Sequence, residues 1–151
     1  MISGILKMRT IDDITTLDIL TILPHRRPFL LIDKLVHYDP QTTQVRTSFQ
    51  ITEDSPFVQG GCLQAAGIME NIAQSCAARI GFYDWLNELP VKPGVIGAVK
   101  GLEIKSFPRV GQTITTYITP KAEAMGVLLA EATVKTSEGS VIAECSIKVA
   151  I

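Results

Sequence analysis

The spacing of apolar residues predicts one long helix near the middle of the chain. Over residues 61–82, apolar side chains recur every three or four positions, which is the period of an α-helix, and Gly81 lies near its expected end. The predicted helix is apolar on nearly all sides and rich in alanine and glycine. A helix of this kind is usually enclosed, so we expect it to lie at the centre of the fold.

Strand patterns flank this helix on both sides. A hairpin is predicted over residues 29–51, with strands at 29–38 and 43–51 and turn chemistry at 39–42, and a short helix is expected over 16–23. Four later runs rich in Val, Ile and Thr predict further strands, namely residues 94–104, 113–124, 126–136 and 140–151. Their short separators favour antiparallel pairing. We therefore predict an α+β fold in which a curved antiparallel sheet of about six strands wraps the central helix.

Length and composition favour one compact domain. With 151 residues, of which 46% are hydrophobic, the chain is expected to form a single domain over residues 1–151, with a loosely held lead over residues 1–15. The net charge of -1 argues against a nucleic-acid binder. No apolar run approaches the roughly 20 residues that span a bilayer, and the N-terminus does not resemble a secretory signal, so we expect a cytoplasmic protein.

The cysteines add no metal site to this picture. Cys62, Cys76 and Cys145 are odd in number and widely spaced, which fits reduced thiols better than disulfides or a zinc site. Cys62 has no His or Asn near it in the sequence, so we interpret it as a small packing residue rather than a nucleophile.

One residue of the predicted helix stands out chemically. Glu70 is the only carboxylate in the otherwise uncharged stretch 62–78. Burying an ionised carboxylate without partners is costly, so such a group usually takes up a proton or serves a site. The alternative is a structural role, in which the Glu70 carboxylate bonds either the backbone of a strand or a serine across the dimer. We therefore take Glu70 as the first candidate for chemistry.

Three motifs follow one another along the chain: I-L-P-H-R-R-P-F-L-L-I-D at residues 22–33, M-E-N-I-A-Q at 69–74 and K-S-F-P-R-V-G-Q at 105–112. In this order they resemble the motifs of the (R)-3-hydroxyacyl-acyl-carrier-protein dehydratases of the FabZ and FabA type. The resemblance covers most of the chain. It implies the hotdog fold, an acyl thioester on acyl carrier protein as substrate, and a homodimer or a heterodimer with a second hotdog subunit.

One motif of that family is absent. The FabZ type carries its catalytic histidine in a G-H-F-P-G loop before the helix, whereas this chain reads P-F-V-Q-G-G-C-L over residues 56–63, with Gly61 near the position of that histidine. The closer resemblance is therefore to the ApeP-like dehydratases of aryl polyene and related pathways, which keep the P-H-x-x-P opening and the helix glutamate. In that setting His25 is the available imidazole.

Dehydration of a 3-hydroxyacyl thioester needs a base, an acid and donors for the thioester oxygen. An imidazole suits the base and a carboxyl group desolvated by an apolar helix suits the acid, which gives His25 and Glu70 these roles. No metal or organic cofactor is needed. Backbone N–H groups at the predicted helix start can bind the thioester oxygen, so we predict the substrate-binding residues there. They are Gly60, Gly61, Cys62 and Leu63.

Several of these residues have a structural interpretation as well. His25 lies between two prolines and is equally suited to cap the short helix or to hold the hairpin. His37 stands without companions beside the predicted turn and is interpreted as structural. Three glutamines either bind substrate or cap backbone groups, and the sequence does not separate these roles: Gln59, Gln64 and Gln74.

Four cations lie in the motifs that would flank a tunnel mouth: Arg26, Arg27, Lys105 and Arg109. An acidic carrier protein needs such a patch for docking. Ordinary solvated charge is the alternative for each of them singly.

Two other functions fit the same resemblance. A thioesterase of this fold would use the helix carboxylate to activate water, and it would release a free thiol. A non-catalytic subunit would shape the acyl tunnel or dock carrier protein for an active partner. The absence of the loop histidine motivates this hypothesis. Such a subunit would show activity only after mixing with its partner.

Overall fold

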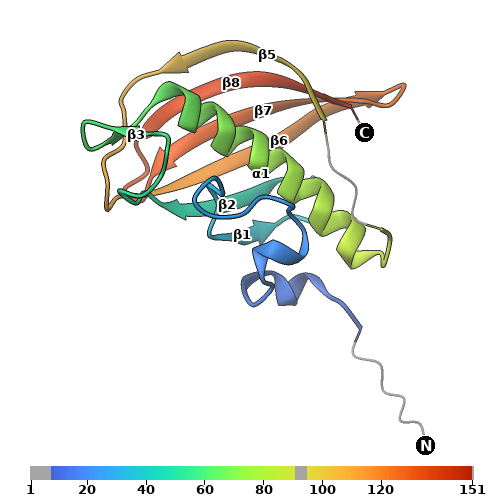
Figure 1. Ribbon diagram of the computed structural model, residues 1–151. Coiled ribbons are helices and arrows are strands. Elements are labelled where there is room, and N and C mark those ends of the chain that lie inside the picture. The colour runs from blue at the N-terminus through green and yellow to red at the C-terminus, as the bar shows by residue number, and fades with distance from the viewer. Residues whose placement is uncertain (1–7, 91–94, 151) are drawn as a thin grey trace, which may run out of the picture.

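The computed structural model describes residues 8–90 and 95–150, and it places one long helix against a curved antiparallel sheet (Figure 1). The helix, α1, spans Ala65–Leu86. The sheet has six strands in the order β1-β2-β6-β7-β8-β5. Their bounds are Lys34–Tyr38 for β1, Val45–Gln50 for β2, Val95–Ile104 for β5, Thr113–Ala124 for β6, Val127–Thr136 for β7 and Val141–Ala150 for β8. The predicted α+β architecture is confirmed.

Alternating side chains decide which face of the sheet meets the helix. In β2, Val45, Thr47 and Phe49 are buried, and the residues between them are partly exposed. Strands β7 and β8 alternate in the same way over most of their length, and β6 does so over its first half. Because successive side chains of a strand point to opposite sides, one face packs on α1 and the other face is open. Two predicted strand ends, residues 94 and 151, lie outside the described residues.

The first strand begins later than the sequence predicts. Residues 29–33 form a loop, and the ladder starts at Lys34. The side chain of Gln74 on α1 bonds this loop, since its Oε1 accepts from the N–H of Leu31 (2.7 Å) and its Nε2 donates to the C=O of Phe29 (2.9 Å). The side chain of Gln74 thus bonds backbone groups that a neighbouring strand would bond if residues 29–33 were part of the sheet. The apolar residues of this loop lie against α1.

The helix also begins later than predicted. Residues 61–63 are expected in its first turn, but Val58–Gln59 and Cys62–Leu63 pair instead as a small hairpin, β3 and β4. Gly60 and Gly61 make its turn with φ values of 60° and 76°, which glycine adopts at little cost. The apolar spacing continues through this hairpin, so periodicity alone does not reveal the boundary.

The β3–β4 hairpin packs closely on the first turn of α1. A Cβ atom at Gly67 would lie 2.5 Å from Leu63 Cδ1 and 2.7 Å from Phe57 Cβ, so glycine permits an approach that a larger residue would block. Gly67 precedes Glu70 by less than one helical turn. The hairpin therefore lies beside the part of the helix that carries the candidate carboxylate.

The N-terminal segment differs in detail from the prediction. In place of one helix over 16–23, the chain forms two short 3-10 helices, η1 at Ile11–Thr15 and η2 at Ile19–Thr21. Residues 1–7 of the predicted lead lie outside the described residues, and Ile14, near the end of that lead, is buried.

Buried polar contacts fix α1 on the sheet. Asn71 is 1% exposed, and its Oδ1 accepts from Thr116 Oγ1 on β6 (2.5 Å). The hydroxyl oxygens of Ser75 and of Thr47 on β2 lie 2.7 Å apart and are hydrogen-bonded. Buried polar groups are costly unless they are bonded, so these contacts define where the helix sits on the sheet.

Within the described part of the chain, no helix is long and apolar enough to cross a membrane.

Candidate active site

The fold brings His25 and Glu70 together although they are far apart in the sequence. His25 comes from the loop before β1, and Glu70 from the second turn of α1. The distance between His25 Nε2 and Glu70 Oε1 is 3.9 Å. The side chains are 32% and 39% exposed, respectively. The two residues predicted as base and acid therefore share one site that is open to solvent.

Gln74 connects this carboxylate to the loop that carries His25. Besides its two bonds to the loop backbone, Gln74 Nε2 donates to Glu70 Oε1 (3.1 Å). The two residues are four positions apart on α1 and are therefore neighbours on its surface. One amide thus holds the Glu70 side chain and the loop in a fixed relation.

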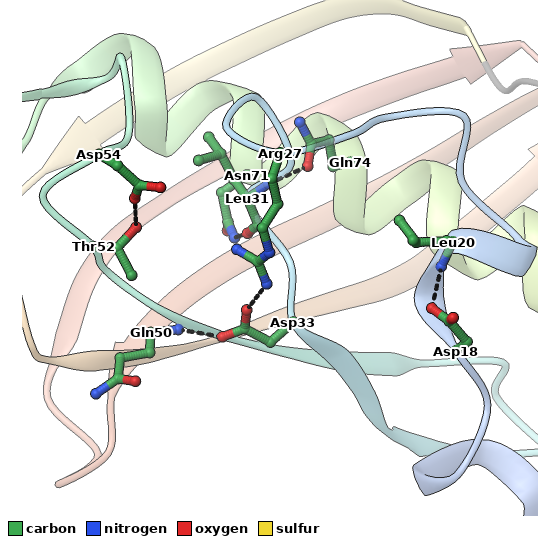
Figure 2. A network of polar contacts seen from close by, with 10 residues as sticks. All are labelled: Asp18, Leu20, Arg27, Leu31, Asp33, Gln50, Thr52, Asp54, Asn71 and Gln74. Atoms are coloured by element: carbon green, nitrogen blue, oxygen red, sulfur yellow. Dashed lines mark hydrogen bonds and ion pairs between the residues drawn. The ribbon is translucent and has the colours of Figure 1, made fainter.

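Asn71 is a second clamp on the same loop. Its Nδ2 donates to the C=O of Leu31 (2.8 Å), and Figure 2 shows Asn71 and Gln74 reaching from α1 to the backbone of Leu31. The N–H and the C=O of one loop residue are therefore both bonded by side chains of the helix. This leaves the loop little freedom to move relative to Glu70.

Two arginines of the P-H-R-R-P motif fasten the rest of the loop. Arg26 Nη1 donates to two loop carbonyls, one of them that of His25 (2.8 Å). Arg27 Nη2 and Asp33 Oδ1 form an ion pair of 2.5 Å, and Asp33 Oδ2 accepts from the N–H of Gln50 on β2 (2.7 Å) (Figure 2). Charged groups make strong hydrogen bonds, so these residues help to fix the loop that carries His25.

His25 has hydrogen-bonding capacity that the described residues leave unused. Its Nδ1 atom is buried and has no partner within the described ranges. Its Nε2 atom is farther from Glu70 than a hydrogen bond requires. Among the described residues, no hydrogen-bond partner fixes the tautomer of His25, so either ring nitrogen can carry the proton. An imidazole of this kind is suited to proton transfer.

The surroundings of Glu70 differ from the sequence expectation. We predict a carboxylate enclosed by apolar helix surface, but in the single chain its side chain is 39% exposed. Met69, the residue before it, is 42% exposed, and Phe29 of the clamped loop is 58% exposed. Glu70 therefore lies in a partly open part of the surface that also exposes Met69 and Phe29.

The predicted substrate-binding residues lie in the β3–β4 hairpin rather than at the helix start. The N–H of Leu63 donates to the C=O of Pro108 (2.9 Å), so this group is already bonded within the chain. Gly60 and Gly61 are exposed, and open space surrounds the position where a Cβ would be. Cys62 is half-buried and bridges to the segment at Arg109.

The helix itself offers a different set of donors. Gln64 is the N-cap and makes no side-chain cap bond, because its Nε2 donates to the carbonyls of Gln59 and Cys62 instead. For the N–H groups of the first turn, at Ala65, Ala66 and Gly67, no acceptor is found among the residues that the structure describes. Such groups at a helix N-terminus favour negative charge nearby.

Three of the four predicted docking cations are bonded within the chain. Arg26 and Arg27 hold the loop as described, and Lys105 Nζ lies 3.4 Å from Glu144 Oε1 on β8. Arg109 is exposed, and its side chain makes no ion pair within residues 8–90 and 95–150.

The cysteines are free thiols. Burial raises the pKa of Cys76 to about 12, and the neighbouring Cys145 adds to this rise. Burial also raises the pKa of Cys145. Cys62 is less buried than either. Among the described residues, no group of three or more His, Cys, Asp and Glu side chains could hold a metal ion.

Comparison with known proteins identifies the family. A family model for ApeP-like proteins, described as ApeP dehydratase, matches residues 17–151. The chain belongs to the ApeP-like dehydratase family. The 3-hydroxyacyl-[acyl-carrier-protein] dehydratase FabZ of Ruminiclostridium cellulolyticum is 29% identical over 144 residues, which cover 91% of this chain and 97% of the relative. FabZ of Acetivibrio thermocellus is 31% identical over 144 residues, with 91% and 94% covered. The resemblance to FabZ and ApeP dehydratases is confirmed.

Solved structures confirm the hotdog fold of this ApeP-like dehydratase. The dehydratase heterocomplex ApeI:P from Xenorhabdus doucetiae matches with a TM-score of 0.79 and 16% identity, over 89% of this chain and 90% of that chain. The PaaI protein from the phenylacetic acid degradation operon of E. coli matches with a TM-score of 0.62 and 10% identity, over 78% and 81%. At these identities the similarity shows the fold alone.

The clamp residues of α1 are the part of the site that sequence reasoning misses. The sequence leaves the role of Gln74 open, and Asn71 is not a candidate at all. The available signal is their spacing, because Glu70, Asn71, Gln74 and Ser75 make two adjacent polar rows along the first half of the helix, which is otherwise apolar. Two such rows indicate that one part of the helix bonds neighbouring backbone and strands.

Proposed function

We propose that this ApeP-like dehydratase removes water from a (R)-3-hydroxyacyl chain held as a thioester on acyl carrier protein, which leaves a trans-2-enoyl thioester. The observation that carries the proposal is the pair of His25 and Glu70, 3.9 Å apart in an open site. Elimination of water needs a base and an acid that reach the same substrate. The names of the FabZ relatives support this class of substrate.

In the proposed reaction, His25 takes the proton from C2, next to the thioester carbonyl, and Glu70 gives a proton to the hydroxyl on C3. The electron pair of the broken C2–H bond forms the double bond as the C3–O bond breaks, and water leaves. Gln74 bonds only Oε1 of Glu70, which leaves Oε2 to carry the transferred proton. Transfer of a proton from His25 to Glu70 then restores the starting state.

The start of α1 is proposed to hold the thioester oxygen. Charge that develops on this oxygen is stabilised by N–H groups that point at it without reorganisation, and the first turn at Ala65, Ala66 and Gly67 supplies them. Gly60 and Gly61 leave room for a chain to pass the hairpin. Cys62 stays a proposed contact, whereas Leu63 contributes buried apolar surface.

A second hotdog subunit is proposed to cover the exposed residues beside Glu70. The exposed Phe29 and Met69 support this assignment, as does the heterocomplex among the similar structures. Covering this surface would exclude water from the carboxylate, as the sequence predicts. Light scattering on the purified chain tests this proposal: a homodimer has twice the mass of the chain, and a monomer requires a different partner.

Arg109 is the strongest of the four proposed carrier-docking cations because it is exposed and makes no ion pair among the described residues. We expect Arg109→Glu to lower kcat/KM about tenfold for a substrate on carrier protein and to leave a short pantetheine thioester unaffected. Lys34→Glu, with the same change of charge on β1, is the control. Equal losses with both substrates would remove Arg109 from docking.

The activity itself is tested by mass spectrometry of a synthetic (R)-3-hydroxyacyl chain on carrier protein. The purified protein is expected to cause loss of water, and Glu70→Gln is expected to abolish this loss. A colour reagent for thiols, added in parallel, detects thioester hydrolysis, since dehydration releases no thiol. Thiol release without water loss would favour a thioesterase.

The second candidate function is a non-catalytic subunit of a dehydratase heterodimer. It is favoured by the absent loop histidine and by the exposed Met69 beside Glu70. In this case the isolated chain is inactive, and activity appears only after a second hotdog subunit is added. Turnover by the isolated chain at an ordinary rate excludes it.

A further inference from the structure

One end of the open sheet face is apolar. Ala122 pairs with Leu129, and Ala124 pairs with Val127, on the side away from α1. Val127 and Leu129 are 40% and 42% exposed, and Met125 at the tip is completely exposed. Figure 1 shows this β6–β7 hairpin extending beyond the ends of the neighbouring strands. We call these five residues the hairpin patch.

The rest of the same face has the polar character that an open sheet face usually has. Towards the other end, the row across β2, β6 and β7 consists of Arg46, Tyr117 and Thr133, and Lys135 lies in the next row. Arg46 and Lys135 both lie over the Tyr117 ring, at 4.9 Å and 4.8 Å from its centroid. The apolar end is therefore a local feature, and exposed apolar patches of this kind mark interaction sites.

The residue at the hairpin tip is not explained by the turn or by packing. Met125 and Gly126 have φ values of 54° and 77°, so both central residues of the turn are in the left-handed region. Turns of this type favour Asn-Gly. Methionine is disfavoured in this conformation and has no contact in the core, so its side chain fits a contact outside the chain.

Three lysines lie beside one end of the hairpin patch, at Leu129. Lys100, Lys121 and Lys148 line one shallow hollow of about 230 Å³ beside Leu129. Lys121 is neutralised by Glu131, with Nζ and Oε2 3.6 Å apart. Lys100 and Lys148 make no ion pair within the described residues. The hollow beside the apolar surface thus contains three lysines and one glutamate, and Lys100 also lines a neighbouring hollow with Glu103, Glu131 and Glu144.

Acidic groups near the tip do not cancel these charges on the open face. Glu123 pairs in the ladder with Leu128, which is buried on the helix side, so the carboxylate belongs to that side of the hairpin. Its electrostatic effect on Arg79, which is on α1, agrees with this placement. On the open face of the hairpin, Glu131 is paired with Lys121, so Lys148 beside Leu129 leaves a positive charge next to the apolar residues.

We propose that the hairpin patch docks the protein on an anionic phospholipid surface. Met125, Val127 and Leu129 would enter the headgroup region, and Lys100 and Lys148 would contact the lipid phosphates. The apolar side chains project at the tip and the lysines are set back from it. At a bilayer surface, the apolar layer likewise lies deeper than the anionic headgroups that attract lysine. The protein would lie on the membrane without crossing it.

A second copy of the chain fits this surface less well than a bilayer does. Two-fold packing of the patch on itself would bring the lysines of the two copies close together, which is unfavourable. The patch is also far from the candidate site, because β6 starts beside the segment that contacts the β3–β4 hairpin and its full length separates the two. A docked protein therefore keeps the His25 and Glu70 site accessible.

Flotation of the full chain with lipid vesicles tests the proposal. The wild type is expected to float with phosphatidylcholine vesicles that contain about a third phosphatidylglycerol, and not with pure phosphatidylcholine. Met125→Asn is expected to reduce the bound fraction at least about fivefold while thermal stability stays equal or rises, since asparagine suits the turn. Lys148→Glu is expected to reduce binding about tenfold.

Lys34→Glu is the matched control because it makes the same change of charge at the other end of the sheet. Its binding is expected to equal that of the wild type. An equal loss of vesicle binding in Lys34→Glu and Lys148→Glu would mean that binding depends only on the overall charge of the protein, and it would overturn the proposal. Absence of flotation, or unchanged binding by Met125→Asn, would overturn it as well. If Met125→Asn instead lowers the mass of an oligomer, the patch contacts a second copy.

Discussion

Two neighbouring residues of α1, Glu70 and Asn71, show how the same helix serves structure on one side and chemistry on the other. Asn71 is 1% exposed and has both functional groups bonded, to Thr116 on the sheet and to Leu31 in the loop. Glu70 is 39% exposed, accepts one bond from Gln74, and faces His25 without bonding it. Successive residues of a helix point about 100° apart, so one step along the chain changes the surroundings completely.

Under the proposed mechanism, saturation of hydrogen bonds separates the structural role of Asn71 from the proposed chemical role of Glu70 better than residue type does. A buried amide with every group bonded fixes the geometry of its neighbours, and nothing is left for a substrate. A half-open carboxylate next to an unbonded imidazole has free capacity that a substrate can use. Removing the first is expected to affect folding, and removing the second is expected to affect turnover.

The sharpest test of this difference is Glu70→Gln. The substitution keeps size and shape but removes the proton donor, so we expect the rate of water loss to fall by about 10²- to 10⁴-fold. The free energy of unfolding should change by less than about 0.5 kcal/mol, because the side chain is partly exposed. Product formation by mass spectrometry and urea unfolding measure the two effects. A variant with full activity would take Glu70 out of the mechanism.

His25→Ala is expected to lower the same rate by about 10²-fold or more through loss of the base. His37→Ala is the matched control, since His37 is exposed on β1 and outside the candidate site. Its rate should equal that of the wild type. Equal losses in the two variants would mean that His25 acts through the fold rather than through proton transfer.

Asn71→Ala is expected to lower stability, in contrast to Glu70→Gln, which is expected to lower the rate and leave stability nearly unchanged. The substitution leaves the Leu31 carbonyl and the Thr116 hydroxyl without partners in a buried place, which costs about 2–3 kcal/mol of unfolding free energy. Asn87→Ala, at the exposed end of α1, should cost less than about 1 kcal/mol. Urea unfolding of both variants measures the difference. Similar losses would show that the buried network contributes no more than a surface bond.

Gln74→Leu should affect both sides, because Gln74 bonds the loop and also Glu70. We expect a loss of about 1–2 kcal/mol of unfolding free energy and about a tenfold lower rate at substrate saturation. Gln44→Leu removes a partly buried bond to Thr119, away from the site, and should lower stability without a change in rate. An unchanged rate in Gln74→Leu would restrict Gln74 to a structural role.

The sheet follows from the sequence because alternation is a local signal. Strand β6 spans Thr113–Ala124 as predicted, and β7 and β8 begin within one residue of their predicted starts. The two wrong boundaries, at residues 29–33 and 61–63, have a common cause. In both places a long-range contact decides the local structure: an amide of α1 takes up the loop backbone, and the N–H of a hairpin residue bonds a distant carbonyl.

In the candidate site, too, local sequence signals indicate some residues, and long-range contacts define the roles of others. His25 and Glu70 become candidates from the sequence because few residue types transfer protons. Glu70 stands alone in an uncharged stretch, and His25 lies between Pro24 and Pro28. The role of Gln74 is not predictable, because an amide bonds whatever backbone the fold brings near, and the sequence does not say which. The openness of Glu70 also depends on whether a second subunit covers it.

Alkaline pH is expected to act on the sheet-facing side of α1, with an effect that is small at a pH of about 9 and grows as the pH rises. Burial raises the pKa of Cys76 to about 12, whereas a thiol in the unfolded chain ionises near about 8.5. Below the lower value both states keep the proton, and stability is unaffected. Above it the unfolded state loses its proton first, so stability falls as pH rises towards the folded value, by about 1 kcal/mol per pH unit above pH of about 9. Urea unfolding of the wild type and Cys76→Ala across this range measures the effect, and Cys76→Ala should show the weaker pH dependence. Parallel profiles would mean that the thiol is not shielded from solvent as its burial indicates.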